Sequence, residues 1–516
     1  MMNRNRREFL SDVGRGMLVA GIGSALAADL GLAPAFADDK AGTLSFGDRE
    51  PLVALLQQTP ANKLLPVVVR KMNEGVSLDS LVAAAALANA RTFGGEDYDG
   101  YHAFMALMPA HHMAAELPAN RRALPVLKVL YRNTNRMQNF GGCKSEVMHP
   151  IAPNAIPSGS PSGEELRSAT RSGNMDAAER TFAAIARGPV DEAFQRLQYS
   201  IDDEVDVHRV VLAWRAWAVL DLAGREQAHT LLRQSVRYCV KAEKNSRRNG
   251  REPEIRTVLP RLLDQYRLVG RALGKRSADD AWVEHLAQTI YAGTGAQAGE
   301  AVAAALAEGM SPEVVGEAIS LAANRLVLCD PGRTKTQTSP GKPEGSVHGA
   351  SVGVHASDSA NAWRNITRVS NERNQVASLI VGAFHTARQS HGQNPEPCPH
   401  PEQLEKIKAQ DAVSLIRETE AAIKDKDQAR ACALVHRYGE LGHRPRPIFD
   451  LLLRYAISED GALHAEKYYR TVSEEFATTR PAFRWRQLVA LARVTASEYG
   501  FPAPGYQEAC RLLNLG

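Results

Sequence analysis

Two stretches of the chain share one pattern. Residues 74–84 read Glu-Gly-Val-Ser-Leu-Asp-Ser-Leu-Val-Ala-Ala, and residues 308–318 read Glu-Gly-Met-Ser-Pro-Glu-Val-Val-Gly-Glu-Ala. The offset is 308 − 74 = 234, and at the same offset Arg91 matches Arg325. In each copy a glycine ends one helix, a serine caps the next, and an acidic residue follows where the helix dipole favours it. The pattern therefore predicts a helical hairpin that occurs twice.

Each copy then leads through a loop to a histidine. The first copy reaches Tyr101-His102-Ala103 and the second reaches Val347-His348-Gly349. The second loop is longer, since 348 − 325 = 23 positions separate arginine from histidine there and 102 − 91 = 11 in the first copy. The histidine that follows each hairpin predicts an internal duplication in which His102 and His348 occupy equivalent positions. The alternative is that a helix-turn-helix pattern recurs by chance in an alanine-rich chain.

Composition favours helices throughout. The 516 residues are 44% hydrophobic and 23% charged, but only 6% aromatic, and β-sandwiches and barrels depend on aromatic and β-branched side chains. Apolar residues recur at helical spacing from Pro51 onward. We expect an all-α fold, a helical hairpin array or bundle with an internal pseudo-duplication and no substantial sheet.

The breaks between helical patterns suggest a division of the chain. We expect a first helical unit with the His102 cluster at 38–160, a hairpin connector at 161–295, and a second helical unit with the His348 cluster at 296–395. Helical hairpins then fill 396–516.

Charge and hydropathy exclude some partners. The 62 Lys and Arg residues and 58 Asp and Glu residues are interspersed and give a net charge of +4, so no basic face for nucleic acid is evident. After the N-terminal segment, no apolar run is long enough to anchor the chain in a membrane. Phosphate-binding glycine loops and the Gly-x-Ser-x-Gly elbow are also missing from the sequence.

The N-terminal segment has the pattern of a targeting signal. Asn5-Arg6-Arg7-Glu8-Phe9-Leu10 precedes a Gly/Ala/Leu-rich stretch, and Ala35-Phe36-Ala37 offers a signal-peptidase site. This segment resembles a twin-arginine export signal, and the alternative is a basic amphipathic helix. The resemblance implies a signal peptide at 1–37, the twin-arginine translocation machinery as a partner, and a periplasmic or secreted location. It also implies that the chain crosses the membrane folded, often with a metal already inserted.

Two short segments resemble known helical families. The hairpin pattern at residues 74–84 is similar to the helical unit of carboxymuconolactone decarboxylase-like proteins. The Val347-His348-Gly349 segment is similar to questin-oxidase-like helical oxygenases. The chain lacks the complete catalytic set of either family, and no Cys-x-x-Cys pair is present among its six cysteines. No family is assigned on these segments, and the cysteine spacing excludes iron–sulfur and c-type haem motifs.

The first histidine cluster comprises His102, His111 and His112. Nine residues separate His102 from His111, which places them on opposite faces of an unbroken helix. A kink at Pro109 would be needed to bring the cluster together.

The second cluster comprises His348, His355 and Asp358. Seven residues place the two histidines two turns apart on one helical face, about 10 Å along the axis, and Asp358 lies one turn further. That distance is too long for one ion, so we expect His102 to supply the missing ligand if the duplicated halves face each other. Imidazole suits iron, copper or zinc, and a carboxylate could bind the metal or orient a ligand.

Other histidines carry less weight in the sequence. Glu204 and His208 are four residues apart on one helical face, but carboxylate-bridged iron sites use Glu-x-x-His on two helices. His229, His285 and His464 stand alone, and a lone histidine is predicted to be a hydrogen-bonded core or surface residue. The polar loop 333–342 is predicted to be a surface loop, with a lid over the His348 site as the alternative.

These patterns lead to one functional expectation. We expect an exported metalloenzyme that acts on a small molecule at a histidine-lined pocket between two equivalent helical units, an oxidoreductase in preference to a hydrolase. Its metal ligands are expected among His102, His111, His112, His348, His355 and Asp358. The alternative is a metal-free helical-repeat binding or scaffold protein whose histidines are incidental.

Overall fold

A computed structural model describes residues 42–154, 162–250, 252–340, 342–349, 351–390, 394 and 396–515. The signal peptide expected at 1–37 lies outside these residues. Within the described ranges the chain is helical, with three isolated β-bridges and no sheet, which confirms the all-α prediction. None of the described helices combines the length and apolar character needed to cross a membrane.

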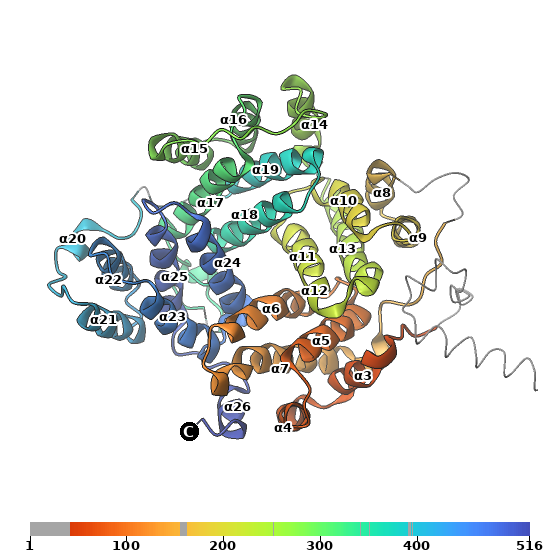
Figure 1. Cartoon of the computed structure of the whole chain (residues 1–516), viewed down its shortest axis with the longest axis horizontal. Coiled ribbons are helices and arrows are strands. Elements are labelled where there is room, and N and C mark those ends of the chain that lie inside the picture. The colour runs from red at the N-terminus through yellow and green to blue at the C-terminus, as the bar shows by residue number, and fades with distance from the viewer. Residues whose placement is uncertain are drawn as a thin grey trace, which may run out of the picture.

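The helices fall into two consecutive halves (Figure 1). The first half runs from α3 to α13, and its helices are α3 (Glu50–Gln58), α4 (Ala61–Asn73), α5 (Leu78–Phe93), α6 (Tyr98–Ala115), α7 (Ala123–Phe140), α8 (Gly163–Arg171), α9 (Met175–Ile185), α10 (Val190–Ile201), α11 (Val207–Ala218), α12 (Leu220–Ala223) and α13 (Ala228–Arg248).

The second half runs from α15 to α25. Its helices are α15 (Asp280–Ala292), α16 (Gly295–Ala307), α17 (Pro312–Leu328), α18 (Val352–Arg368), α19 (Glu372–Ala387), α20 (Pro401–Leu404), α21 (Ala412–Lys424), α22 (Gln428–Glu440), α23 (Arg446–Ser458), α24 (His464–Thr478) and α25 (Trp485–Glu498).

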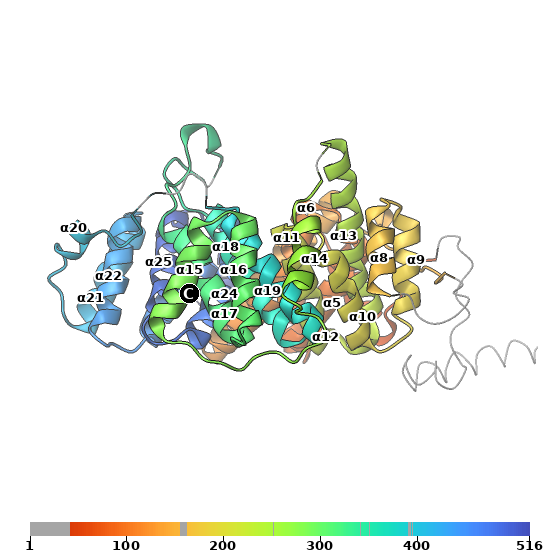
Figure 2. The same cartoon turned by 90° about the horizontal axis from the view of Figure 1, so that it is seen from above.

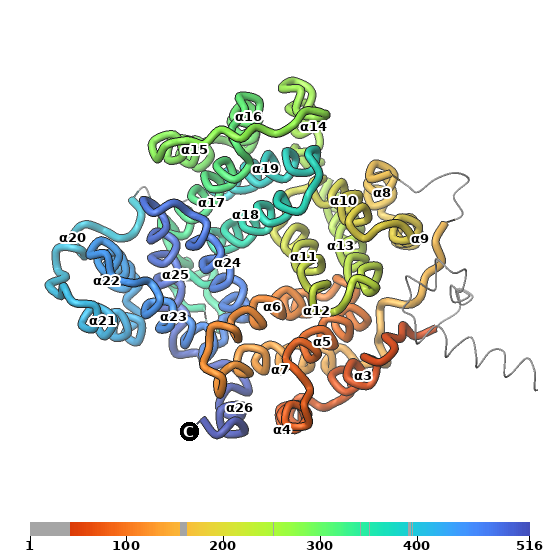
Figure 3. Tube along the Cα trace, in the orientation of Figure 1, coloured from red at the N-terminus to blue at the C-terminus, as the bar shows by residue number. Residues whose placement is uncertain are grey.

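The two halves repeat one packing arrangement. In the first, α5 packs against α6 and α11 packs against α13; in the second, α17 packs against α18 and α24 against α25. The halves meet where α11 lies against α18 and α24 lies against α6. These four helices surround the middle of the molecule, as the cartoon and the Cα tube both show (Figures 1 and 3). The helix arrangement is therefore pseudo-symmetric about a point between α6, α11, α18 and α24.

Each half also lends a helix to the other. The connecting helix α14 (Ile255–Gln265) follows the first half but packs against α16 and α19 of the second. The last helix, α26 (Tyr506–Leu512), follows the second half but packs against α4 and α7 of the first. This exchange adds contacts between the two halves beyond those at the centre.

The repeated sequence pattern builds the repeated hairpin. Gly75 and Gly309 adopt positive φ angles of 99° and 88°, a backbone region that glycine tolerates best. Ser77 and Ser311 then cap α5 and α17 by accepting hydrogen bonds from backbone N–H groups three residues later. In α5, the alanine run 83–86 is fully buried, and these small side chains let the neighbouring helices approach closely.

Candidate metal centre

Four histidines gather where the halves meet. His102, His208, His355 and His464 lie near the N-terminal ends of α6, α11, α18 and α24. One ring nitrogen from each of His102, His355 and His464 lies within 4.8 Å of the other two. His208 adjoins this group through its contact with His102. The central helices thus bring together four imidazoles from distant parts of the chain.

The Nε2 atoms of the four rings face one another in pairs. The Nε2 atoms of His102 and His208 are 3.2 Å apart, and those of His355 and His464 are 3.1 Å apart. The ring centroids of His102 and His464 are 4.9 Å apart, which links the two pairs. Two imidazoles that share a tetrahedral zinc ion at about 2.0–2.1 Å have nitrogens about 3.3 Å apart. The spacing within each pair therefore matches that of two ligands to one ion, whereas the nitrogens of His102, His355 and His464 together lie within the wider limit of 4.8 Å.

Backbone carbonyls orient two of the rings. The Nδ1 atom of His102 lies 2.7 Å from the carbonyl oxygen of Tyr98, and that of His464 lies 3.0 Å from the carbonyl oxygen of Ala462. In each case the Nδ1–H group donates, so the Nε2 lone pair is available to a metal. Metal-binding histidines are usually held in this way by a second hydrogen bond.

Burial keeps the four rings neutral. Loss of solvent lowers the pKa of His208 to about 4 and holds the pKa values of His102, His355 and His464 well below that of an exposed histidine. The Lys467 ammonium lowers all four pKa values further. A metal competes with a proton for each nitrogen, so neutral imidazoles are the form that binds.

A buried amine and a buried carboxyl lie beside the centre. Lys467 is one turn after His464 on α24, and Asp358 is one turn after His355 on α18. Burial lowers the pKa of Lys467 to about 8, and the Asp358 carboxylate partly opposes that shift. Asp358 Oδ1 accepts a hydrogen bond from the Thr471 hydroxyl at 2.8 Å. The second half thus places opposite charges next to its histidine pair.

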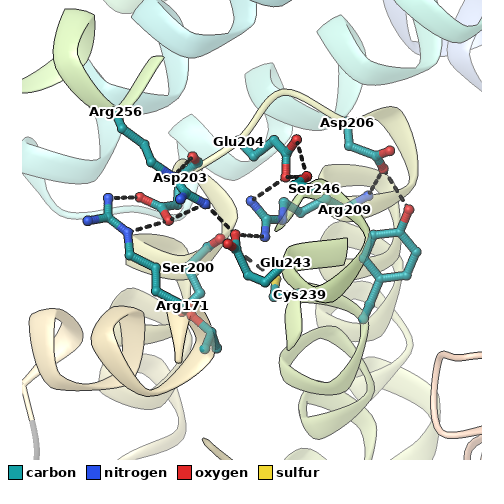
Figure 4. A network of polar contacts seen from close by, with 12 residues as sticks. Arg171, Ser200, Asp203, Glu204, Asp206, Arg209, Cys239, Glu243, Ser246 and Arg256 are labelled. Atoms are coloured by element: carbon teal, nitrogen blue, oxygen red, sulfur yellow. Dashed lines mark hydrogen bonds and ion pairs between the residues drawn. The ribbon is translucent and has the colours of Figure 1, made fainter. Parts of the chain in front are cut away.

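A polar network fixes the start of α11, which carries His208. Asp206 Oδ1 accepts hydrogen bonds of 2.8 Å from the backbone N–H of Arg209 and from the Tyr238 hydroxyl, and lies 3.8 Å from His208 Nδ1. The network continues from Arg209 to Glu243 at 3.3 Å, and other ion pairs join α8, α13 and α14 to it (Figure 4). This network fixes the backbone that carries His208, while Asp206 lies close to the ring without a hydrogen bond to it.

His348 occupies a different position from the one that the duplication suggested. Helix α18 begins at Val352, so His348 lies in the preceding loop, and His355 takes the place near the helix start that His102 has in α6. His348 Nε2 is 3.4 Å from Glu498 Oε1, and its ring centroid is 6.1 Å from that of His464. His348 thus borders the three-histidine group without belonging to it.

Gly349 lets this loop approach the centre. Its N–H group donates to Glu498 Oε1 at 2.8 Å. A Cβ atom at this position would lie only 2.2 Å from the Cβ of His464. Only glycine therefore fits between the loop and the start of α24.

The remaining sequence candidates lie apart from the group. Helix α6 continues through Pro109, so His111 and His112 are near its far end. His111 Nε2 contacts Asp79 Oδ1 at 2.7 Å, and burial lowers the pKa of His112 to about 4. Asp358 is directed to Thr471 and not to the ring nitrogens. The structure therefore brings His102 and His355 together and leaves His111, His112, His348 and Asp358 outside the group.

His208 carried little weight in the sequence, where it was paired only with Glu204, and His464 was predicted to be a lone core or surface histidine. His208 is 106 residues from His102 in the chain, and His464 is 109 residues from His355. Such separations leave no local spacing motif. All four histidines lie within the first five residues of their helices, a feature that a search for motifs within one segment does not test.

A pocket of ≈ 250 Å³ reaches the centre. His102 and His464 form part of its wall, and the loop 333–342 contributes Lys342. The other lining residues are Tyr98, Asp99, Arg132, Asn135, Arg136, Asn139, Ala462 and Leu463. A small molecule in this pocket would lie directly against two of the four imidazoles.

Comparison with known proteins identifies no relative. The chain matches no family model, no curated protein and no solved structure.

Proposed function

We propose that the chain is a metal-dependent oxidoreductase that acts on a small molecule. It binds one transition-metal ion through His102, His355 and His464, with His208 as the fourth ligand. The observation that carries this proposal is the set of three ring nitrogens within 4.8 Å of one another, joined by a fourth imidazole. The substrate occupies the adjoining pocket that His102 and His464 line.

The donor set favours particular metals. It contains only neutral imidazoles, which suit iron, copper, zinc and nickel, whereas calcium and magnesium prefer oxygen ligands. A bound iron or copper ion would supply the electron-transfer chemistry that amino-acid side chains lack. The twin-arginine-like N-terminus adds support, because chains with such signals often receive a metal before export.

The pocket favours oxidation over hydrolysis. A metal-dependent hydrolase commonly needs a general base near the bound water. The only carboxylate among the described lining residues is that of Asp99, which lies 3.4 Å from the Arg136 guanidinium. This carboxylate is exposed and paired with Arg136, so it is poorly placed to take a proton from a metal-bound water.

Residues around the centre have distinct tasks in this proposal. The carbonyls of Tyr98 and Ala462 fix the tautomers of His102 and His464. Lys467, with a pKa of about 8, holds a proton beside the centre at neutral pH and can release it when positive charge arrives. Its burial excludes water from this side of the centre.

The rival is a metal-free helical binding protein. The Nε2 separations of 3.1 and 3.2 Å also fit hydrogen bonds between neutral imidazoles, in which His208 donates to His102 and His355 donates to His464. On this reading the four rings hold the two halves together.

Elemental analysis separates these functions. The full-length chain, purified without a histidine tag, is compared with His355→Ala/His464→Ala, and His285→Ala, which changes an exposed histidine, is the control. We expect about one iron, copper or zinc ion per chain, lost in the double variant and kept in the control. Circular dichroism checks that the double variant stays helical. Absence of metal from the wild type, even after incubation with these ions, would overturn the proposal.

A further inference from the structure

The pocket beside the centre has a cationic wall. Arg132 pairs with Asp460, and Arg136 pairs with Asp97 and Asp99. Lys342, in contrast, forms no ion pair with any residue that the structure describes, although it is half-buried. Burial and the nearby Arg333 lower the pKa of Lys342, and the Glu498 and Asp460 carboxylates, neither of which pairs directly with it, only partly oppose this shift. A bound anion would supply the missing partner.

Other groups on the wall suit a planar organic anion. The amides of Asn135 and Asn139 offer N–H donors. The Tyr98 ring lies 4.3 Å from the His102 ring, centroid to centroid, yet the residue remains 53% exposed. One side of this ring therefore packs against the centre while the rest is open to a ligand.

The centre itself needs negative charge. Neutral imidazoles leave the charge of a bound divalent cation uncompensated, and the N-terminal ends of α6, α11, α18 and α24 add their positive dipoles. The need for negative charge at the metal rests on the proposed function, whereas the cationic wall of the pocket is present without a metal.

We infer that the pocket binds a small organic acid as its carboxylate. The carboxylate pairs with Lys342, and the body of the molecule lies over Tyr98 next to His102 and His464. The pocket volume of ≈ 250 Å³ limits the ligand to a compact molecule, since drug-sized ligands occupy roughly 300–1,000 Å³.

Calorimetric titration of the full chain tests this inference, with benzoate as the probe and benzamide as its neutral counterpart. Lys342→Gln removes the charge, Lys342→Arg keeps it, and Lys335→Gln changes an exposed lysine on the same loop. We expect benzoate but not benzamide to bind, with affinity reduced about tenfold in Lys342→Gln, largely kept in Lys342→Arg and unchanged in Lys335→Gln. Each protein is titrated as purified and after chelator treatment.

The outcomes separate this inference from the proposed function. Lys342-dependent benzoate binding in a chain that takes up no metal would support the anion site and contradict the metalloenzyme. Stoichiometric metal without benzoate binding would support the metalloenzyme and contradict the anion site. Equal binding of benzoate and benzamide, an unaltered affinity in Lys342→Gln, or tighter binding of inorganic phosphate than of benzoate would overturn the carboxylate site.

Discussion

The two halves place the same helices around the centre but fill corresponding positions differently. One turn after its histidine, α6 carries Met105 and α11 carries Val211, both buried and apolar. One turn after the matching histidines, α18 carries Asp358 and α24 carries Lys467, both buried and ionisable. The first half shows that apolar side chains fill this position, so packing does not require the charged pair of the second half. We therefore propose that Asp358 and Lys467 serve the function of the centre, which the variants below test.

The largest expected effect compares the centre with His229, a half-buried histidine that stands alone. Burial lowers the pKa of His208 to about 4 and that of His229 to about 3. It also holds the pKa values of His102, His355 and His464 well below that of an exposed histidine. Below about pH 6.5 the unfolded chain takes up protons that the folded chain refuses, so stability falls as pH falls. Each such histidine lowers the free energy of unfolding by about 1.4 kcal/mol per pH unit until its folded pKa is reached.

Urea unfolding at about pH 7 and about pH 5 measures this loss. We expect a steep decline in the metal-free chain and a shallower one in His229→Leu, since one such histidine is removed. Added metal should restore stability at the lower pH in both proteins, because it competes with protons at the centre alone. Equal stability of the metal-free chain at the two pH values would contradict neutral burial of these rings.

The second effect concerns the charged pair. Asp358→Asn removes the stronger of the two carboxylate charges that favour the buried Lys467 ammonium and leaves only that of Glu466, so we expect a loss of up to about 3 kcal/mol of unfolding free energy. The double variant Asp358→Leu/Lys467→Met imitates the first half, and we expect its stability to be within about 1–2 kcal/mol of the wild type. Denaturant titration of both variants tests the difference. A double variant as unstable as Asp358→Asn would show that the pair is needed for packing.

The same pair predicts a change in metal affinity. Lys467→Met removes a positive charge from beside the ion, so metal should bind more tightly, and the affinity of the wild type should rise with pH as Lys467 deprotonates near pH 8. Competition with a chromogenic chelator measures both. Weaker binding by Lys467→Met at neutral pH would contradict this placement of charge.

The smallest effect distinguishes His208 from the three grouped histidines. We expect His208→Ala to lower metal affinity about 10–100-fold while stoichiometric binding remains measurable, and Asp206→Asn to have a smaller effect through the orientation of His208. Chelator competition again provides the readout. Loss of all metal binding in His208→Ala would contradict this distinction and show that His208 is as necessary for metal binding as His464.

The sequence predicted the fold class and the repeated hairpin because both depend on local patterns. The glycine and serine at the start of α5 recur at the start of α17, and the structure confirms both caps. The equivalence of His102 and His348 was inferred from their order along the chain. In the structure, the long second loop extends past His348, so that His355 holds the position equivalent to His102.

The metal centre was only partly accessible to sequence reasoning. His102 was a candidate because it follows the repeated hairpin, and His355 because it lies seven residues from His348 on one helical face. His208 was paired only with Glu204, and His464 stood alone. They join the group only because α11 packs against α18 and α24 packs against α6. Contacts between helices a hundred residues apart follow from packing of the whole chain, which no single segment encodes. The roles of all these residues in metal binding stay predictions.

X-ray absorption at the metal edge tests the central claim most directly. The full-length chain is loaded with the ion found by elemental analysis, or with zinc. The account predicts a first shell dominated by nitrogen at about 2.0–2.1 Å for zinc, with the outer-shell scattering of three or four imidazoles, and loss of that pattern in His464→Ala. A first shell of sulfur, a shell of oxygen without imidazole scattering, or an unchanged spectrum in His464→Ala would contradict a histidine centre at the junction of the two halves.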